Sequence, residues 1–267
     1  MRGYRLLKCA SCTFIWDPTP NENPLLQYDK SYFINQNPKG GYANYFAGMQ
    51  VNKRTFSQRL KKIKDRMGNK GKLLDVGCAL GDCLLEAKKL GWKDILGVDP
   101  STYAITQARK RGIKSIKGTL DNAKLKNNSQ DVILYQDVIE HLGQPLIELK
   151  NVYRILKPQG LFFLVTPDIG SSLAKLLKSN WYHYKPGEHI AYFSEKTIAK
   201  LLKKVGFKAI TVQPAKHIMS VEYICKRLVY YSPGLFSVLL GVSQELGLEK
   251  KSLQLYTGEL EVWAYKD

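Results

Sequence analysis

Residues 72–82, with the sequence KLLDVGCALGD, constrain the fold of this chain more than any other segment. Their apolar run predicts a buried strand that leads through Asp75 into a turn, and Gly77 and Gly81 allow that turn to be tight before a helix begins. Free N–H groups at the start of such a helix point toward a bound ligand. The Gly-x-Gly-x-x-Gly spacing of dinucleotide sites does not occur here, and the Asp75 carboxylate suits a cationic ligand. The segment therefore predicts a nucleotide-type cofactor site.

Further apolar runs alternate with helical patterns and predict more strands of the same sheet. Residues 95–98 end in Asp99, whose carboxylate could accept two ribose hydroxyls or, alternatively, cap the helix expected over 103–111. The next strands are expected over 113–117, 131–137 and 161–166, the last preceded by a helix over 139–156 and a turn at 157–160. This alternation predicts an α/β fold with a doubly wound sheet, in which ligands lie beyond the carboxyl ends of the strands.

The last part of the chain completes the predicted sheet. Ser194 has the features of a helix N-cap, and residues 207–212 and 258–266 predict the sixth and seventh strands. We interpret the intervening residues 215–256 as a helical insertion, or lid, over an acceptor site. Its apolar run at 228–242 is interrupted by proline and is too short to span a bilayer, so contact with lipid or a polyprenyl chain is the less favoured interpretation.

The turn at residues 75–81 resembles the first motif of class I S-adenosylmethionine-dependent methyltransferases, Asp/Glu-x-Gly-x-Gly-x-Gly. Asp75, Gly77 and Gly81 match this motif, whereas Ala79 replaces its middle glycine. Because alanine avoids positive φ, we expect a slightly altered turn at this position. The resemblance implies a Rossmann-like, seven-stranded, mostly parallel sheet over residues 46–267, with the last strand antiparallel.

The same resemblance implies S-adenosylmethionine as the cofactor, with its ribose at Asp99 and its adenine beside residues 118–121. The cofactor-binding residues expected on this basis are Asp75, Gly77, Cys78, Ala79, Gly81, Asp99, Pro100, Thr119, Leu120 and Gln136. The implied reaction is methyl transfer to an oxygen or carbon atom of a small molecule, such as a sugar, a polyketide or a lipid-linked intermediate. The alternatives are an RNA ribose 2′-O-methyltransferase and a degenerate module that binds S-adenosylmethionine without catalysis.

Two acids and a histidine follow the fourth strand in the sequence Asp137-Val138-Ile139-Glu140-His141. At the start of a helix, Asp137, Glu140 and His141 would share one face. The pattern resembles Glu-x-x-Glu-His in ubiquinone-pathway O-methyltransferases and in small-RNA 3′-terminal 2′-O-methyltransferases, where these residues and a later histidine hold a divalent ion. His189 is the candidate for that later histidine, and residues 187–194 resemble the Pro-Glu-His-x-x-Tyr-Phe-Ser stretch of many small-molecule methyltransferases.

Three interpretations of this group stay open. His141 or His189 could act without a metal as the general base toward the acceptor. The acids could instead complement a helix dipole beside a buried histidine. A divalent ion could be bound by four candidate ligands, Asp137, Glu140, His141 and His189. We favour the metal-free base over the metal, and His183, among the aromatic residues at 181–184, is a third catalytic candidate.

The amino-terminal residues 1–45 predict an arm outside the methyltransferase domain. Cys9 and Cys12 form a Cys-x-x-Cys pair that resembles the second half of a small zinc ribbon found ahead of some methyltransferases. Because further ligands are not nearby in sequence, we do not expect this pair to hold zinc. The proline- and aromatic-rich stretch 17–45 could cap the substrate mouth or pack as a strap on the core. Residues 56–67 then show apolar side chains at helical spacing, which predicts an amphipathic covering helix.

Charge and composition limit the remaining classes of partner. The formal net charge is +18, but the lysines are dispersed over helical faces and no arginine-rich stripe occurs. A small-molecule acceptor is therefore favoured over nucleic acid, an anionic lipid surface stays open, and no sequence pattern fixes an oligomeric state. Five cysteines and the lack of an apolar leader at the amino terminus indicate a reducing, cytoplasmic compartment.

Overall fold

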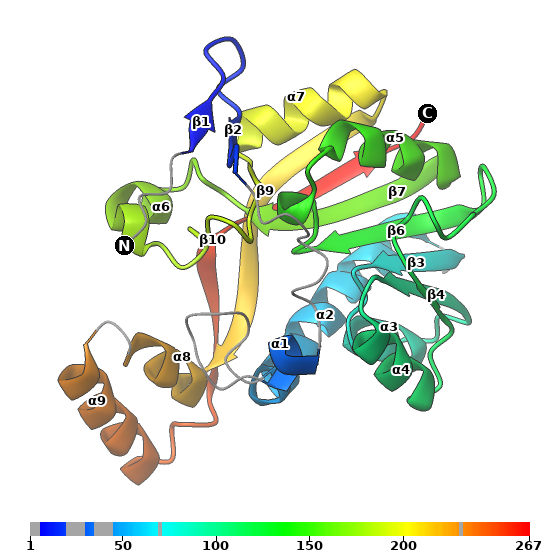
Figure 1. Cartoon of the computed structure of the whole chain (residues 1–267). Coiled ribbons are helices and arrows are strands. Elements are labelled where there is room, and N and C mark those ends of the chain that lie inside the picture. The colour runs from blue at the N-terminus through cyan, green and yellow to red at the C-terminus, as the bar shows by residue number, and fades with distance from the viewer. Residues whose placement is uncertain (1–5, 20–29, 35–44, 69–70, 230–231) are drawn as a thin grey trace.

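One central sheet of seven strands organises the molecule. The computed structural model describes residues 6–19, 30–34, 45–68, 71–229 and 232–267. The strands are β3 (Lys72–Val76), β4 (Asp94–Asp99), β5 (Ser115–Lys117), β6 (Gln130–Gln136), β7 (Leu156–Pro167), β9 (Lys208–Ser220) and β10 (Ser252–Tyr265). They pair in the order β5-β4-β3-β6-β7-β10-β9, and β10 alone runs antiparallel to its neighbours (Figure 1). The doubly wound, mostly parallel sheet predicted from the sequence is confirmed.

Helices cover both faces of this sheet, because successive strand residues point to opposite sides. Leu73, Val132 and Phe163 face one core, and their neighbours Leu74, Ile133 and Phe162 face the other. The first face packs against α2 (Tyr45–Met67), α3 (Asp82–Lys89) and α4 (Thr102–Lys110), and the second against α5 (Pro145–Ile155) and α7 (Glu195–Val205). Residues 56–67 lie in α2 and bury their apolar stripe, as predicted. Among the described residues, none of the helices has the length and apolar character needed to cross a bilayer.

The second half of the chain differs from the prediction in its element boundaries. Residues 139–156 do not form one helix: a 3₁₀ turn, η1 (Ile139–His141), is followed by α5, which starts at Pro145 because proline has no N–H to donate within a helix. The expected turn at 157–160 lies within β7. β9 and β10 extend beyond the sheet as a two-stranded ribbon in which Ser220 pairs with Ser252.

The helical insertion is consequently shorter than the expected 215–256. It consists of α8 (Val221–Leu228) and α9 (Pro233–Glu245), carried at the far end of the ribbon formed by β9 and β10 (Figure 1). The ribbon form was not visible in the sequence because antiparallel pairing satisfies backbone groups whichever side chains are present.

The amino-terminal arm forms a hairpin that joins the domain through a second, small sheet. β1 (Leu7–Lys8) pairs with β2 (Ile15–Trp16), and β2 pairs with β8 (Ala191–Tyr192). The buried Asp17 accepts the Gly187 N–H on Oδ2 at 2.8 Å and donates its own N–H to the Ile190 carbonyl at 2.8 Å. The hairpin is thus fastened to the loop that precedes β8.

The predicted half zinc ribbon lies in the turn between β1 and β2. N–H groups of Cys12 and Ser11 lower the pKa of the Cys9 thiol. Most of the stretch 17–45 lies outside the described residues. Its short helix α1 (Lys30–Ile34) packs the Phe33 ring 5.6 Å from the Tyr103 ring of α4, so this part of the arm is strapped onto the domain.

Candidate active site

A cavity of about 1310 Å³ lies at the carboxyl ends of β3, β4 and β6. It gathers residues that the sequence predicted separately, because the ends of parallel strands meet at one edge of the sheet. The predicted residues that line it are Asp75, Gly77, Cys78, Ala79, Asp99, Pro100, Thr119, Leu120, Gln136, Asp137, Glu140, His141, His183 and His189. Gly81 is not among the lining residues and instead begins α3, where its N–H donates to the Cys78 carbonyl at 2.8 Å.

The turn after β3 approaches the cavity with its backbone. Gly77 has a φ of +73°, and a Cβ at this position would lie 2.4 Å from Cγ2 of Val138. Ala79 also has a left-handed backbone, with a φ of +45°. The sequence predicted an altered turn in which Ala79 would avoid a positive φ. The turn is not altered in this way. Ala79 therefore keeps the backbone form of a glycine motif at the cost of local strain.

Two buried carboxyl groups face the cavity beside this turn. Asp99 accepts the Ala79 N–H on Oδ2 at 2.9 Å and the Ser101 N–H on Oδ1 at 2.8 Å. The helix cap considered for Asp99 is supplied by Ser101, whose Oγ accepts the Ala104 N–H. Burial raises the pKa of Asp99 to about 6, and burial together with the Asp99 charge raises the pKa of Asp75 to about 8. A cationic ligand in the cavity would stabilise the ionised form of both groups.

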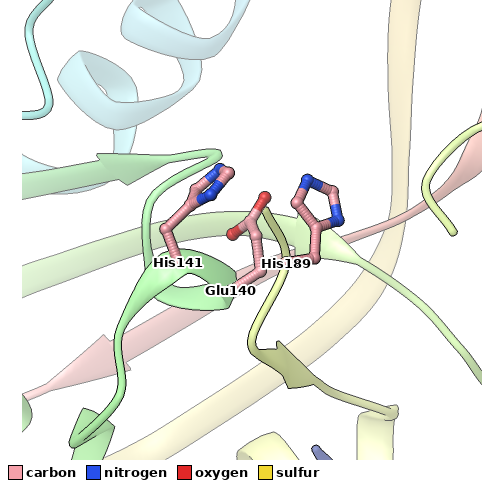
Figure 2. A group of neighbouring side chains, drawn as sticks. All are labelled: Glu140, His141 and His189. Carbon is pink, nitrogen blue, oxygen red and sulfur yellow. The ribbon is translucent and has the colours of Figure 1, made fainter. Parts of the chain in front are cut away.

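Glu140, His141 and His189 converge from η1 and from the loop before β8. Figure 2 shows the Glu140 carboxylate between the two imidazole rings, and ligand atoms of the three residues all lie within 4.8 Å of one another. His141 Nδ1 lies 2.9 Å from the Glu188 carbonyl, and His189 Nδ1 lies 2.9 Å from the His183 carbonyl. Because a carbonyl only accepts hydrogen bonds, both rings carry their proton on Nδ1 and leave Nε2 unprotonated.

The electrostatics of the group keep both histidines neutral. Burial lowers the pKa of His141 to about 4, and burial and the neighbouring His141 lower the pKa of His189 well below its ordinary value. Burial raises the pKa of Glu140 to about 8, although Thr166 donates a hydrogen bond to its Oε2 at 3.0 Å. Two neutral imidazoles and one carboxyl can serve proton transfer or hold a divalent ion.

Asp137 does not belong to this convergent group. It precedes the 3₁₀ turn with a φ of +57°, so it does not share a helix face with Glu140 and His141 as the spacing predicted. Its carboxyl is buried, and Oδ1 has no hydrogen-bond partner among the described residues. Burial, followed by the charges of Glu259 and Glu140, raises the pKa of Asp137 well above its ordinary value.

A second polar group lining the cavity was missed from the sequence. Arg59 of α2 donates from Nη1 to Gln136 Oε1 at 2.9 Å, and its Nη2 lies 3.2 Å from His217 Nε2. His217 Nε2 in turn lies 2.5 Å from Oε2 of Glu259, and His183 Nε2 lies 3.9 Å from the same oxygen. Burial alone would raise the pKa of Glu259, but the two histidines hold it well below its usual range.

Apolar side chains from the helices also line part of the cavity. They include Leu173 and Leu177 of α6 (Ser172–Leu177), Ile224 and Leu228 of α8, and Phe236 of α9. The helices that the ribbon carries therefore contribute side chains to the same cavity that contains the acids and histidines.

Comparison with known proteins identifies the domain. Residues 49–212 match a family model described as a methyltransferase domain. An uncharacterized protein of Methanocaldococcus jannaschii is 30% identical over 141 residues, which are 53% of this chain and 66% of that protein. The ubiquinone biosynthesis O-methyltransferase of Xanthomonas oryzae is 27% identical over 146 residues, 48% of this chain and 61% of the enzyme. The chain thus spans less than two-thirds of the length of these curated relatives.

A solved structure shows the same fold. It is a SAM-dependent methyltransferase of Thermotoga maritima, described as a possible histamine N-methyltransferase, with a TM-score of 0.56 at 22% identity and coverage of 84% of this chain and 93% of that one. The family and the fold predicted from the sequence are both confirmed. The chain belongs to the methyltransferase-domain family, and S-adenosylmethionine is the cofactor of that family.

Proposed function

We propose that this protein transfers the methyl group of S-adenosylmethionine to an oxygen or carbon atom of a small apolar acceptor. The observation that carries the proposal is that the acid-lined turn after β3 and the neutral pair His141 and His189 face one cavity. Methyl transfer needs a cationic donor, an aligned acceptor and a group that removes the acceptor proton. This cavity offers side chains suited to each requirement.

On the donor side, the carboxyl groups match the charges of S-adenosylmethionine. Asp99 retains lone pairs on both oxygens, so it can accept the ribose hydroxyls while it holds the Ala79 and Ser101 amides. Asp75 faces the same space and would be ionised by a nearby sulfonium or ammonium group. The buried Arg59, whose Nε has no hydrogen-bond partner among the described residues, suits the methionine carboxylate.

On the acceptor side, His189 is the proposed general base and His141 its alternative. The proton moves from the acceptor hydroxyl to Nε2, the acceptor oxygen forms a bond to the methyl carbon, and the carbon–sulfur bond breaks to give a neutral thioether. The imidazolium that forms would favour ionisation of the neighbouring Glu140 carboxyl, and the resulting carboxylate would stabilise it. The carbonyl bonds to Nδ1 hold both rings in the orientation that this transfer needs.

A divalent ion is the second role supported by a specific observation. Glu140, His141 and His189 bring their ligand atoms within 4.8 Å, and carbonyl bonds to Nδ1 orient both imidazoles as in many metal sites. An ion held there would lower the pKa of an acceptor hydroxyl and make a base unnecessary. We favour the metal-free role because two neutral histidines already provide the base.

The apolar lining supports a lipid-soluble acceptor over a sugar or an RNA ribose. Leu177, Leu228 and Phe236 would pack against an apolar part of the acceptor. Asn180, Tyr182 and Lys185 in the same lining could bind its polar part. The similarity to a ubiquinone biosynthesis O-methyltransferase agrees with an apolar acceptor that carries a hydroxyl group. In this proposal, α8 and α9 form a lid over the acceptor.

The proposal is tested by a mass-shift screen. The purified protein is incubated with methyl-deuterated S-adenosylmethionine and either a lipid extract, a water-soluble metabolite extract or total RNA. We expect labelled methyl groups in a lipid-soluble product, and a His189→Ala protein processed in parallel should label little. Label confined to RNA or to water-soluble metabolites would overturn the proposed acceptor class.

A further inference from the structure

An exposed apolar stripe runs along α9, at the end of the ribbon most distant from the sheet (Figure 1). Its members recur at helical spacing and therefore lie on one side of the helix and its C-terminal end. They are Leu235, Val238, Leu239, Val242 and Leu246, with exposed fractions of 56%, 65%, 43%, 45% and 65%. Contiguous apolar surface of this kind on a protein usually marks a site of contact with a partner or a membrane.

The packing of α9 does not account for this stripe. Phe236 lines the cavity and Ser243 is buried, so the face that packs on the protein is a different one. Ser237 and Gln244 are exposed on a third, polar face. α9 therefore has a packed face, a polar face and an unoccupied apolar face.

Exposed apolar side chains also occur on β10. Leu253 and Leu255 of β10 are also exposed, and Leu255 lines the cavity together with Phe236. The lining of the cavity thus includes an exposed apolar side chain of β10 as well as a side chain of α9.

The charged residues near the stripe indicate which kind of partner, a second copy of the chain or a membrane, would cover it. Lys250 and Lys251 are exposed directly after the end of the stripe, whereas the exposed Lys226 of α8 is paired with Glu222 at 2.6 Å. A second copy of the chain would bring another formal charge of +18 to the contact and would be repelled. Anionic headgroups above an acyl layer complement both the lysines and the apolar stripe.

We propose that α8, α9 and the residues from the end of α9 to Lys251 dock on an anionic membrane surface, with the stripe of α9 at the boundary between headgroups and acyl chains. This inference goes beyond the proposed methyl transfer and does not depend on it, because binding to a membrane requires no turnover.

Vesicle flotation tests the inference directly. The full-length protein is mixed with vesicles of phosphatidylcholine alone or of equal parts phosphatidylcholine and phosphatidylglycerol. We expect the wild-type protein to float with the anionic vesicles and to be released at high salt. The double variant Val238→Glu/Leu239→Glu should bind about tenfold more weakly or worse, because it places charge in the stripe.

The matched control is Ser237→Glu/Gln244→Glu, which adds the same charge to the polar face of the same helix. This control should retain vesicle binding within about threefold of wild type, since its only effect is electrostatic. Both variants should keep wild-type thermal stability and affinity for S-adenosylmethionine. A Lys250→Ala/Lys251→Ala variant should lose binding to anionic vesicles selectively.

Three results would overturn the proposal. One is a wild-type protein that does not float with anionic vesicles. Another is an equal loss of vesicle binding in the stripe variant and the control variant, which would show that only the added negative charge weakens binding. The third is a dimer in sedimentation velocity that Val238→Glu/Leu239→Glu converts to monomer, which would assign the stripe to a second copy. A failed methyl-transfer screen alone leaves this inference unaffected.

Discussion

The imidazole rings of His141 and His189 meet edge to face, with their centroids 4.8 Å apart, and both are oriented by carbonyls of one loop. Residues 183–189 supply these carbonyls and His189 itself. The backbone of this loop therefore helps to orient both imidazole rings in the cavity. Such an arrangement keeps a neutral imidazole in one tautomer and one orientation.

Replacing His189 with alanine should lower kcat by about a hundredfold or more, the usual contribution of a general base. The affinity for S-adenosylmethionine should stay close to that of the wild type, because the proposed donor-binding groups are Asp75, Asp99 and Arg59 and not His189. Single-turnover kinetics and calorimetry measure the two quantities separately. Wild-type turnover in this variant would show that His189 has a structural role only.

Removal of metal ions separates the two roles proposed for the histidine group. We expect activity to persist after dialysis against EDTA, because neither His141 nor His189 needs an ion to remain neutral. The comparison uses the same protein with added Mg²⁺, Mn²⁺ or Zn²⁺. Activity that disappears with EDTA and returns with one of these ions would instead make Glu140, His141 and His189 ligands of that ion.

Binding of S-adenosylmethionine should depend on pH through Asp75. The pKa of this carboxyl is raised to about 8 in the protein without ligand, so the group is mostly protonated at neutral pH. A cationic ligand lowers that pKa, so binding releases a proton and affinity rises as the pH increases toward about 8. Calorimetry in buffers of different ionisation enthalpy measures the released protons.

The raised pKa of Asp75 also determines how the stability of the ligand-free protein changes with pH. Because the folded-state pKa of Asp75 lies above its unfolded value, this group stabilises the ligand-free protein at low pH and loses that contribution as the pH rises through about 8.

An Asp75→Asn variant should bind S-adenosylmethionine more weakly and without proton release at neutral pH. Proton release that persists in this variant would place the titrating group elsewhere.

Loss of the Asp99 carboxylate should weaken S-adenosylmethionine binding by about tenfold or more, the effect expected for losing hydrogen bonds to a charged group. Calorimetry on Asp99→Ala measures this, and Asp99→Asn serves as a second variant that can still accept the Ala79 or Ser101 amide. Asp94→Ala, an exposed change at the opposite end of β4, should bind like the wild type. Unchanged affinity in both Asp99 variants would refute the ribose assignment.

Glycine at position 79 should stabilise the protein. Ala79 has a φ of +45°, a conformation that costs a non-glycine residue roughly 1 kcal/mol or more, of which glycine recovers a part after its greater chain entropy is counted. Urea unfolding should place Ala79→Gly about 0.5 kcal/mol above the wild type. Ala87→Gly in the interior of α3 should be destabilising by about 1 kcal/mol, and a similar loss in Ala79→Gly would show that position 79 is not strained.

The part of the site that could be predicted from the sequence is local. Asp99 is the last residue of β4 and Asp75 the last but one of β3. The position of a strand end follows from a few neighbouring residues, and ligands lie at such ends. His189 could be placed beside His141 through the resemblance to a known motif. These residues were correctly expected at one edge of the sheet.

The parts that were missed depend on contacts between distant segments. His217 was assigned to a helical insertion because nothing near it in sequence shows that β9 continues to Ser220 against β10. Glu259 lies in the strand predicted over 258–266 and Arg59 in the helix predicted over 56–67, and neither pattern marks these residues as part of a site. Their burial and mutual contacts arise only when α2, β9 and β10 come together. Asp137 was misplaced because a 3₁₀ turn replaced the helix start.

The bonds of Asp17 to Gly187 and Ile190 give the amino-terminal hairpin a bearing on catalysis. They fasten the hairpin to the residues on either side of His189. A shortened protein that begins where the family match begins, at residue 49, would keep the donor-binding turn and lose these bonds. Such a protein should bind S-adenosylmethionine but methylate poorly. The amino-terminal hairpin, which lies outside the family match, would then be needed for activity.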